Sequence, residues 1–359
     1  MIIDGKHLQS IWYERSIDTV CIIDQTRLPH EFEIISLDSL EDACDAITTM
    51  QVRGAPLIGV TAAYGVYLAL REDPQLIDSA IRSLLATRPT AVNLQWALQR
   101  AEKAVLGLPA EQRAAMALQM AQLIEKEDIA VCEAIGEHGV GILQEIWEDK
   151  RGCQDSLNVL THCNAGALAT VDWGTALSVV YKSVAAGVPV HVWVDETRPR
   201  NQGAALTCWE LGQQGIPHTL VVDNAGGHLM QQGDVDLCLV GSDRTTLDGD
   251  VCNKVGTYLK ALAASDNGVP FYVAVPVSSI DFSASQEAIP IEERSASEVS
   301  HVSGLDENRQ LKQVRVAPEN VAVSNFGFDI TPARLVTGII TELGVFDANR
   351  ESLGSMTAQ

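Results

Sequence analysis

The sequence predicts an α/β protein in two parts, and three observations support this prediction. The chain has 359 residues, enough for about two domains that each bury a core. Residues 1–150 are mostly long stretches whose polar residues recur with a helical period. Residues 151–359 alternate short apolar runs with helical stretches, the pattern of a parallel sheet covered by helices. We therefore expect a mainly helical domain over 1–150 and a parallel-sheet domain over 151–359.

The first part begins with strand-like runs and continues as helices. Residues 20–24 and 33–36 are rich in β-branched side chains, and residues 37–50 have helical spacing. Stretches rich in Ala and Leu then predict helices at residues 55–71, 76–86, 92–106, 109–126 and 129–147. The pattern breaks near residues 148–155, where we place the domain boundary.

The second part contains five apolar runs that predict strands, at residues 157–161, 190–194, 219–222, 237–240 and 271–275. Helices are expected between them. Residues 283–313 are polar and irregular. Thr331-Pro332 is expected to open a last helix, because proline suits the first turn of a helix.

Polar side chains follow each of these five strands. The strand ends read His162-Cys163-Asn164, Asp195-Glu196-Thr197-Arg198, Asp223-Asn224, Gly241-Ser242-Asp243-Arg244 and Pro276-Val277-Ser278-Ser279. Ligands of open parallel sheets bind at the carboxyl ends of the strands. Helix capping can explain Asp, Asn or Ser at such places, but not a thiol, carboxylates and an arginine together. The sequence therefore predicts an active site at this edge.

Composition excludes several classes of partner and site. The formal net charge of −22 disfavours nucleic acid and anionic membranes, and the apolar runs are too short to cross a bilayer. No basic and then apolar segment opens the chain, so we expect a cytoplasmic protein. The eight cysteines include no C-x-x-C pair, and no H-E-x-x-H occurs, so we expect neither a zinc site nor disulfides. Without a phosphate-loop or dinucleotide motif, no nucleotide cofactor is expected.

Cys163 and Asp243 are the candidates for chemistry. A thiol beside backbone N–H groups and cations can become a usable acid, base or nucleophile, whereas a lone cysteine is more often buried packing. Asp243 follows an apolar strand, so its carboxyl could keep a proton near neutral pH; alternatively it pairs with Arg244 or Lys254 as a structural anion. His162 adjoins Cys163 but should point to the opposite face of the strand, so we do not expect it to be the base.

Three basic segments could hold an anion. Arg53 precedes Gly54-Ala55-Pro56, and Arg88 precedes Pro89-Thr90; each lies before a predicted helix, where free N–H groups favour phosphate. Asn253-Lys254 follows Gly249-Asp250 at what we take to be a third helix start. The alternative for each cation is a solvated surface charge.

Together these segments resemble the methylthioribose-1-phosphate isomerase family, which also includes the regulatory subunits of the eukaryotic translation-initiation guanine-nucleotide exchange factor. The resemblance spans nearly the whole chain. The matching segments are residues 51–56, 88–94, 161–170, 195–199 with Gln202-Gly203, 241–244, 249–257 and 328–332.

The resemblance implies a small helical N-terminal domain with a short antiparallel sheet, a Rossmann-like C-terminal domain, and a homodimer that needs no cofactor. It implies that Cys163 and Asp243 form the catalytic pair, with Asp243 as proton donor. It also implies that the sugar-phosphate substrate is bound by Arg53, Gly54, Ala55, Arg88, Gln202, Asn253 and Lys254. Two alternatives stay open: an isomerase of another pentose 1-phosphate, such as ribose 1,5-bisphosphate or 5-deoxyribose 1-phosphate, and a non-catalytic regulatory subunit.

Overall fold

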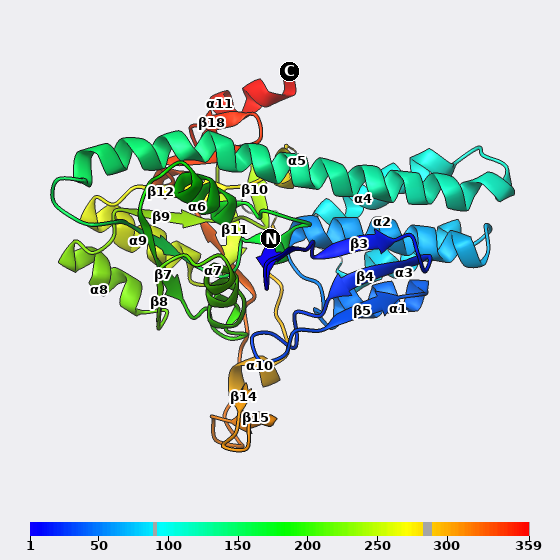
Figure 1. Ribbon diagram of the computed structural model, residues 1–359, viewed down its shortest axis with the longest axis horizontal. Coiled ribbons are helices and arrows are strands. Elements are labelled where there is room, and N and C mark those ends of the chain that lie inside the picture. The colour runs from blue at the N-terminus through cyan, green and yellow to red at the C-terminus, as the bar shows by residue number, and fades with distance from the viewer. Residues whose placement is uncertain (89–91, 283–288, 359) are drawn as a thin grey trace.

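The computed structural model describes residues 1–88, 92–282 and 289–358, and its fold is of the predicted class. A mainly helical N-terminal part with small antiparallel sheets lies beside a C-terminal part built on a large, mostly parallel sheet (Figure 1). The long helix α5 runs over both parts along one side of the molecule (Figure 1). No helix in the described ranges is long and apolar enough to cross a membrane.

The N-terminal part packs its helices around α2. Its strands are β1 Ile2–Ile3, β2 Lys6–His7, β3 Ile11–Glu14, β4 Thr19–Ile23 and β5 Ile34–Leu37, and its helices are α1 Leu40–Thr48, α2 Ala55–Glu72, α3 Ile77–Thr87, α4 Val92–Val105 and α5 Ala110–Lys150. Strands β3, β4 and β5 form an antiparallel sheet. Nearly every residue of α2 is buried, because α1, α3, α4, α5 and this sheet pack around it.

Helix α5 corrects one prediction, because residues 109–126 and 129–147 belong to a single helix, Ala110–Lys150. The polar step at Glu127-Asp128 contains neither Gly nor Pro, so nothing in it breaks a helix. Glu127 pairs with Arg100 of α4, and Asp128 accepts a hydrogen bond from the Val171 N–H at 2.7 Å. Both charged side chains therefore have partners within the continuous helix.

The C-terminal part alternates strands and helices as predicted. Its strands are β6 Leu157–Thr161, β7 Val190–Asp195, β8 His218–Val221, β9 Leu237–Val240, β10 Arg244–Thr246, β11 Val251–Lys254, β12 Phe271–Ala274, β13 Ile280–Asp281, β14 His301–Leu305, β15 Leu311–Arg315, β16 Phe328–Thr331, β17 Gly338–Thr341 and β18 Gly344–Phe346. Its α-helices are α6 Ala176–Ala185, α7 Cys208–Gln213, α8 Ala225–Gln232, α9 Thr257–Asn267, α10 Ser297–Ser300 and α11 Arg350–Gly354.

The large sheet has the strand order β18-β17-β12-β9-β6-β7-β8, with β18 antiparallel at the edge and the other strands parallel. Leu237 and Leu239 of β9 pack toward α5 and α6, while Cys238 and Val240 pack toward α8 and α9. Both faces are thus covered. From β6 the chain adds β7 and β8 on one side, then returns to add β9 on the other side. The strand order reverses between β6 and β9, which is where such sheets bind ligands.

A smaller sheet, β13-β10-β11-β16, continues from the end of β9. The hairpin of β10 and β11 brings Asn253 and Lys254 back beside Asp243, whose N–H donates to the Cys252 carbonyl oxygen at 3.0 Å. Asn253 and Lys254 therefore lie at the end of a strand; the prediction that they begin a helix is wrong, because α9 begins at Thr257.

The predicted last helix is also absent at Thr331-Pro332. Ala333–Leu335 forms only one 3-10 turn, and β17 then joins the large sheet beside β12. All four residues of Gly338–Thr341 are buried, and two of them are β-branched isoleucines that suit an interior strand. Whether residues 1–150 and 151–359 fold as separate domains stays a prediction, since α5 contributes to the cores of both parts.

Glycines allow α5 to approach α6 closely. A Cβ at Gly139 would lie 2.4 Å from Val179 Cγ2, whereas a Cβ at Gly141 in the same helix would meet nothing within 4 Å. Alanine favours a helix over glycine by about 1 kcal/mol, but overpacking costs about 1–3 kcal/mol. We expect Gly139→Ala to lower the free energy of unfolding and Gly141→Ala to raise it slightly, as measured by urea unfolding. A Gly139→Ala protein as stable as Gly141→Ala would contradict this packing.

Candidate active site

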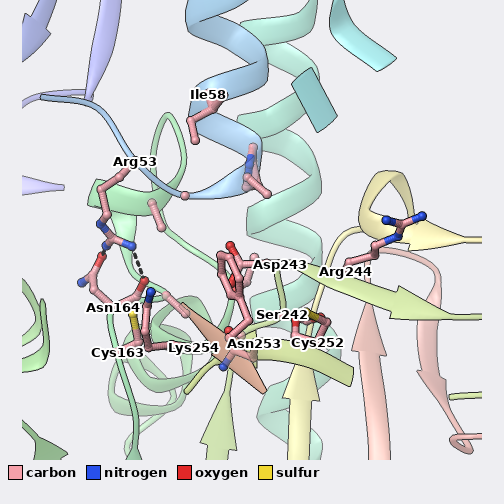
Figure 2. A pocket seen from close by; sticks show the side chains of 18 of the residues that line it. Arg53, Ile58, Cys163, Asn164, Ser242, Asp243, Arg244, Cys252, Asn253 and Lys254 are labelled. Carbon is pink, nitrogen blue, oxygen red and sulfur yellow. Dashed lines mark hydrogen bonds between the residues drawn. The ribbon is translucent and has the colours of Figure 1, made fainter. Parts of the chain in front are cut away.

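A cavity lies at the carboxyl ends of β6 and β9, where the strand order reverses. Side chains from the ends of both strands, from β11 and from the start of α2 surround it (Figure 2). All nine residues that the sequence singled out line this one cavity: Arg53, Gly54, Ala55, Arg88, Cys163, Gln202, Asp243, Asn253 and Lys254. They come from segments up to 201 residues apart in the chain, from Arg53 to Lys254, and the fold brings them together.

Cys163 follows β6 in an unusual backbone conformation. Its φ is +68°, in the left-handed region that a residue with a Cβ adopts only at some cost. Its N–H donates to Thr197 Oγ1 at 2.8 Å, and its carbonyl oxygen accepts from Thr207 Oγ1 at 2.7 Å. The thiol donates toward Gln202 Oε1 at 3.4 Å. The two threonines therefore hold the strained backbone that presents the sulfur to the cavity.

Burial raises the pKa of the Cys163 thiol, and the positive charges of Arg53 and Lys254 partly oppose this rise. The thiol therefore keeps its proton to a higher pH than an exposed cysteine does. Cations alone would lower the pKa of a thiol, but here the loss of water outweighs the two cations.

Asp243 follows β9, the strand that pairs with β6, so it lies at the same edge of the sheet as Cys163. Burial raises the pKa of its carboxyl, against the influence of Lys254, Arg88 and Arg53. Arg244 does not pair with it, because the guanidinium pairs with Asp281, and Figure 2 shows Arg244 pointing away from the other labelled side chains. A carboxyl with a raised pKa can hold a proton for transfer, as a structural anion in an ion pair does not.

Arg53 is buried at the entrance to α2. Its Nη1 donates to the Asn164 carbonyl oxygen at 2.8 Å and its Nη2 donates to Asn164 Oδ1, while its Nε is buried with no partner among the described residues. Asn164 is held in turn by Glu210 at 3.0 Å. The N-cap Gly54 has φ +92°, and a Cβ there would lie 2.4 Å from the Ala169 carbonyl oxygen. Only glycine lets α2 begin so close to the backbone of Ala169, which also lines the cavity.

Lys254 ends β11 with its ammonium inside the cavity. The Nζ donates to the Gly327 carbonyl oxygen at 3.0 Å and lies 4.8 Å from the centre of the Phe328 ring. Burial lowers the pKa of Lys254, while Cys163 and Asp243 act in the opposite direction. Asn253 is fixed by its own turn, since its Nδ2 donates to Thr257 Oγ1 at 3.0 Å.

The other cations of the cavity have carboxylate partners. Arg88 pairs with Glu292 at 3.3 Å, and Arg294 pairs with Glu292 at 2.9 Å and Glu298 at 3.1 Å. Arg244 pairs with Asp281. Among the described residues that line the cavity, Arg53 and Lys254 are the cations for which no carboxylate lies within ion-pair distance. Arg88 is the C-cap of α3, and the helix predicted after it is α4, which the structure describes from Val92; residues 89–91 between them lie outside the described residues.

Sequence reasoning missed part of the wall. Arg294 lies in the stretch that we read as irregular, where no period or motif pointed to it. Apolar side chains complete the wall, namely those of Met50, Ile58, Pro276, Ile289, Pro290 and Phe328. Asn164 stood in the quoted strand end, and its role in holding Arg53 depends on a contact between parts of the chain 111 residues apart.

Comparisons with known proteins agree with this architecture. Residues 51–348 match the Initiation factor 2 subunit family. The chain is 57% identical to the methylthioribose-1-phosphate isomerase of Methylocella silvestris, covering 99% of this chain and 98% of the relative. It is 54% identical to that of Escherichia coli, covering 100% and 97%.

Two solved structures share the fold. The 5-methylthioribose 1-phosphate isomerase of Pyrococcus horikoshii is 38% identical, with a TM-score of 0.83 over 98% of this chain and 96% of that one. A structure described as translation initiation factor eIF-2B, subunit delta, from A. fulgidus is 39% identical, with a TM-score of 0.81 over 98% and 100%. The chain therefore belongs to the Initiation factor 2 subunit family and, within it, to the family of the methylthioribose-1-phosphate isomerases.

Proposed function

We propose that this protein is an aldose-ketose isomerase that converts 5-methylthioribose 1-phosphate to 5-methylthioribulose 1-phosphate in methionine salvage. The observation that carries the proposal is the pairing of a thiol, Cys163, with a carboxyl of raised pKa, Asp243, at neighbouring strand ends beside two cations without carboxylate partners. The isomerases of 54–57% identity support the same reaction.

The substrate imposes a particular chemistry. Because the anomeric oxygen carries the phosphate, the sugar ring cannot open to a free aldehyde. The bond between C1 and the ring oxygen must break, and the ring oxygen must gain a proton. The C2 hydrogen moves to C1, and the C2 hydroxyl loses its proton as the ketone forms. Atoms balance without any cofactor, since substrate and product are isomers.

We assign the proton for the ring oxygen to Asp243. Its raised pKa keeps the carboxyl protonated at a higher pH than an ordinary aspartate, which suits a general acid. We assign Cys163 to the hydrogen and hydroxyl at C2, because it faces the same cavity from the neighbouring strand. The C2 hydrogen can reach C1 as a proton through an enediolate or as a hydride; both routes need the acid and the buried surroundings.

We assign phosphate binding to the side chains of Arg53 and Lys254 and to the N–H groups of Gly54 and Ala55 at the start of α2. In a protein of net charge −22, attraction must come from such short contacts where the dielectric is low. Arg88, Gln202 and Asn253 are further contacts for the sugar phosphate, since they line the same cavity. The raised pKa of Asp243 also lessens the negative charge that the dianion meets.

The pairing of the remaining cations favours a monophosphate. Arg88, Arg244 and Arg294 have carboxylate partners, so they offer little net charge to a second phosphate. The apolar wall formed with Met50, Ile58 and Ile289 suits a methylthio group at C5. This favours 5-methylthioribose 1-phosphate over ribose 1,5-bisphosphate. A homodimer, a cytoplasmic location and the lack of nucleic-acid or membrane partners stay predictions.

The first test compares substrates and removes each reactive group. We expect turnover of 5-methylthioribose 1-phosphate at a higher kcat/KM than of ribose 1,5-bisphosphate. Cys163→Ser and Asp243→Asn should each lower kcat by at least about a hundredfold, the scale of losing a positioned acid or base. Cys153→Ser, at an exposed cysteine far from the cavity, is the control. Absence of any turnover by the wild type would favour the regulatory-subunit alternative, and a near-normal rate in either variant would remove that residue from the mechanism.

The second test concerns the ammonium in the cavity. Lys254→Met keeps the aliphatic length and removes the charge, so KM should rise more than about tenfold, or about 1.4 kcal/mol. Lys312→Met removes an exposed lysine of the β14-β15 hairpin and should leave KM within about twofold. Steady-state kinetics with a thermal melt of each variant decide the matter. An unchanged KM in a folded Lys254→Met protein would move the phosphate site elsewhere.

A further inference from the structure

A buried histidine behind the thiol contacts two hydrogen-bond acceptors. The His162 side chain is fully buried; its Nδ1 lies 2.9 Å from Asp195 Oδ2, and its Nε2 lies 2.9 Å from the Val255 carbonyl oxygen. A neutral imidazole donates one hydrogen bond and accepts one. A carboxylate and a carbonyl only accept. Both contacts are therefore favourable only if the ring carries two protons, or if the Asp195 carboxyl carries one of them.

The surrounding charges place that proton on the ring. Lys260 Nζ lies 3.2 Å from the same Oδ2 atom, which favours an ionised Asp195. Asp223 Oδ1 lies 4.0 Å from the ring Nδ1. Burial raises the pKa of the nearby Asp329 carboxyl, and the His162 ring is among the groups that oppose this rise. With the carboxylates of Asp195 and Asp223 against the single ammonium of Lys260, an imidazolium brings these four groups from a net charge of about −1 to about 0, which lowers the cost of burying them.

His162, Asp195 and Asp223 lie close enough together to be considered as metal ligands. Three of their four carboxylate oxygens already have hydrogen-bond or ion-pair partners, and only Asp195 Oδ1 is buried without one among the described residues. Asp195 Oδ2 contacts the His162 ring at 2.9 Å and the Lys260 ammonium at 3.2 Å. The two carboxylate oxygens of Asp223 accept hydrogen bonds from the backbone N–H groups of Thr197 at 2.7 Å and Arg198 at 2.8 Å. This arrangement fits a hydrogen-bonded cluster whose cations are side chains of the protein itself.

The contacts of His162 connect the two groups that matter most in the cavity. His162 directly precedes Cys163 at the end of β6, and Val255 directly follows Lys254 at the end of β11. Gly256 packs closely against the ring, since a Cβ there would lie 2.8 Å from His162 Cε1. Asp329 accepts a hydrogen bond from the Gly256 N–H at 2.7 Å. The turn after Lys254 is thus held between Asp329 and His162.

We propose that His162 is a positioning residue. As a doubly protonated imidazolium, it holds the Cys163 thiol and the Lys254 ammonium at a fixed distance and orientation from each other. The proposal rests on the proposed function, in which these two groups serve hydrogen transfer and phosphate binding. Because His162 directly follows β6 of the large sheet, its contact with Val255 transmits the position of that sheet to the turn that carries Lys254. A shift of this turn would move the phosphate relative to the thiol, and small misplacements of substrate are costly in catalysis.

Two substitutions separate the two contacts. His162→Asn places its amide nitrogen near the position of Nδ1, so it keeps the contact to Asp195 but cannot reach Val255. His162→Gln places its amide nitrogen near Nε2 and keeps the contact to Val255. We expect His162→Asn to raise KM for 5-methylthioribose 1-phosphate at least about tenfold, with a smaller change in kcat, and His162→Gln to stay within about threefold of the wild type.

The control is His191→Asn on β7, a partly exposed histidine whose ring contacts Thr219 Oγ1 at 2.9 Å; its KM should stay within about twofold. A merely structural role would lower the thermal midpoints of both His162 variants and leave their KM values equal to that of the wild type, which would overturn the proposal. If His162→Asn does not fold, Gly256→Ala presses on the same ring from the other side, and an unchanged KM in that variant would overturn it.

The protonation state is measured without activity. Nitrogen-15 spectra of histidine-labelled wild type at pH 7.5 should show both ring nitrogens of His162 in the protonated range, assigned by their loss in a His162 variant. A ring with an unprotonated Nδ1 would overturn the imidazolium. Wild-type turnover distinguishes the two levels of the account: an inactive wild type would refute the proposed function, whereas an active wild type with an unaffected His162→Asn KM would refute only this inference.

Discussion

The pairing of β6 with β9 is the contact on which the rest of the site depends. These strands are neighbours in the middle of the large sheet, with Val159 opposite Leu237 and Leu160 opposite Cys238. Because the chain leaves β6 in one direction and returns beside it with β9, the carboxyl ends of both strands open onto one cavity. Cys163 and Asp243 each follow one of these strands. Their proximity is thus a consequence of strand order and needs no flexible loop.

A second feature is how an acidic protein builds a site for an anion. The cavity holds several arginines, yet most are balanced by Glu292, Glu298 or Asp281, and the charge left for a ligand comes from Arg53 and Lys254. Removal of water raises the pKa of the nearby acid and thiol, so each keeps its proton to a higher pH than the same group in water. The same burial therefore prepares an acid and avoids repelling a phosphate.

Much of this could be predicted from the sequence, because the information is local. The strands at residues 157–161 and 237–240 were predicted with their observed bounds, since short apolar runs bounded by polar residues mark buried strands. The polar strand ends pointed to an active site for the same reason. All nine candidate residues line one cavity, although their individual roles stay predictions.

Other features depend on contacts that no local pattern contains. The continuity of α5 follows from partners that Glu127 and Asp128 find elsewhere in the chain. The β10-β11 hairpin, and hence the placement of Lys254 at a strand end, follows from pairing with β16. Likewise, Arg294 enters the cavity from a stretch without periodicity. Which cations are balanced is decided by tertiary pairing, so the sequence could name the charges but not their availability.

The most direct measurement of the central claim is a crystal structure of the Cys163→Ser variant with 5-methylthioribose 1-phosphate bound. The account predicts the phosphate between Arg53, Lys254 and the start of α2, the ring oxygen facing Asp243, and the C2 hydroxyl beside residue 163. A sugar phosphate bound outside the cavity between the ends of β6 and β9, or bound within it with the ring oxygen turned away from Asp243, would contradict the account.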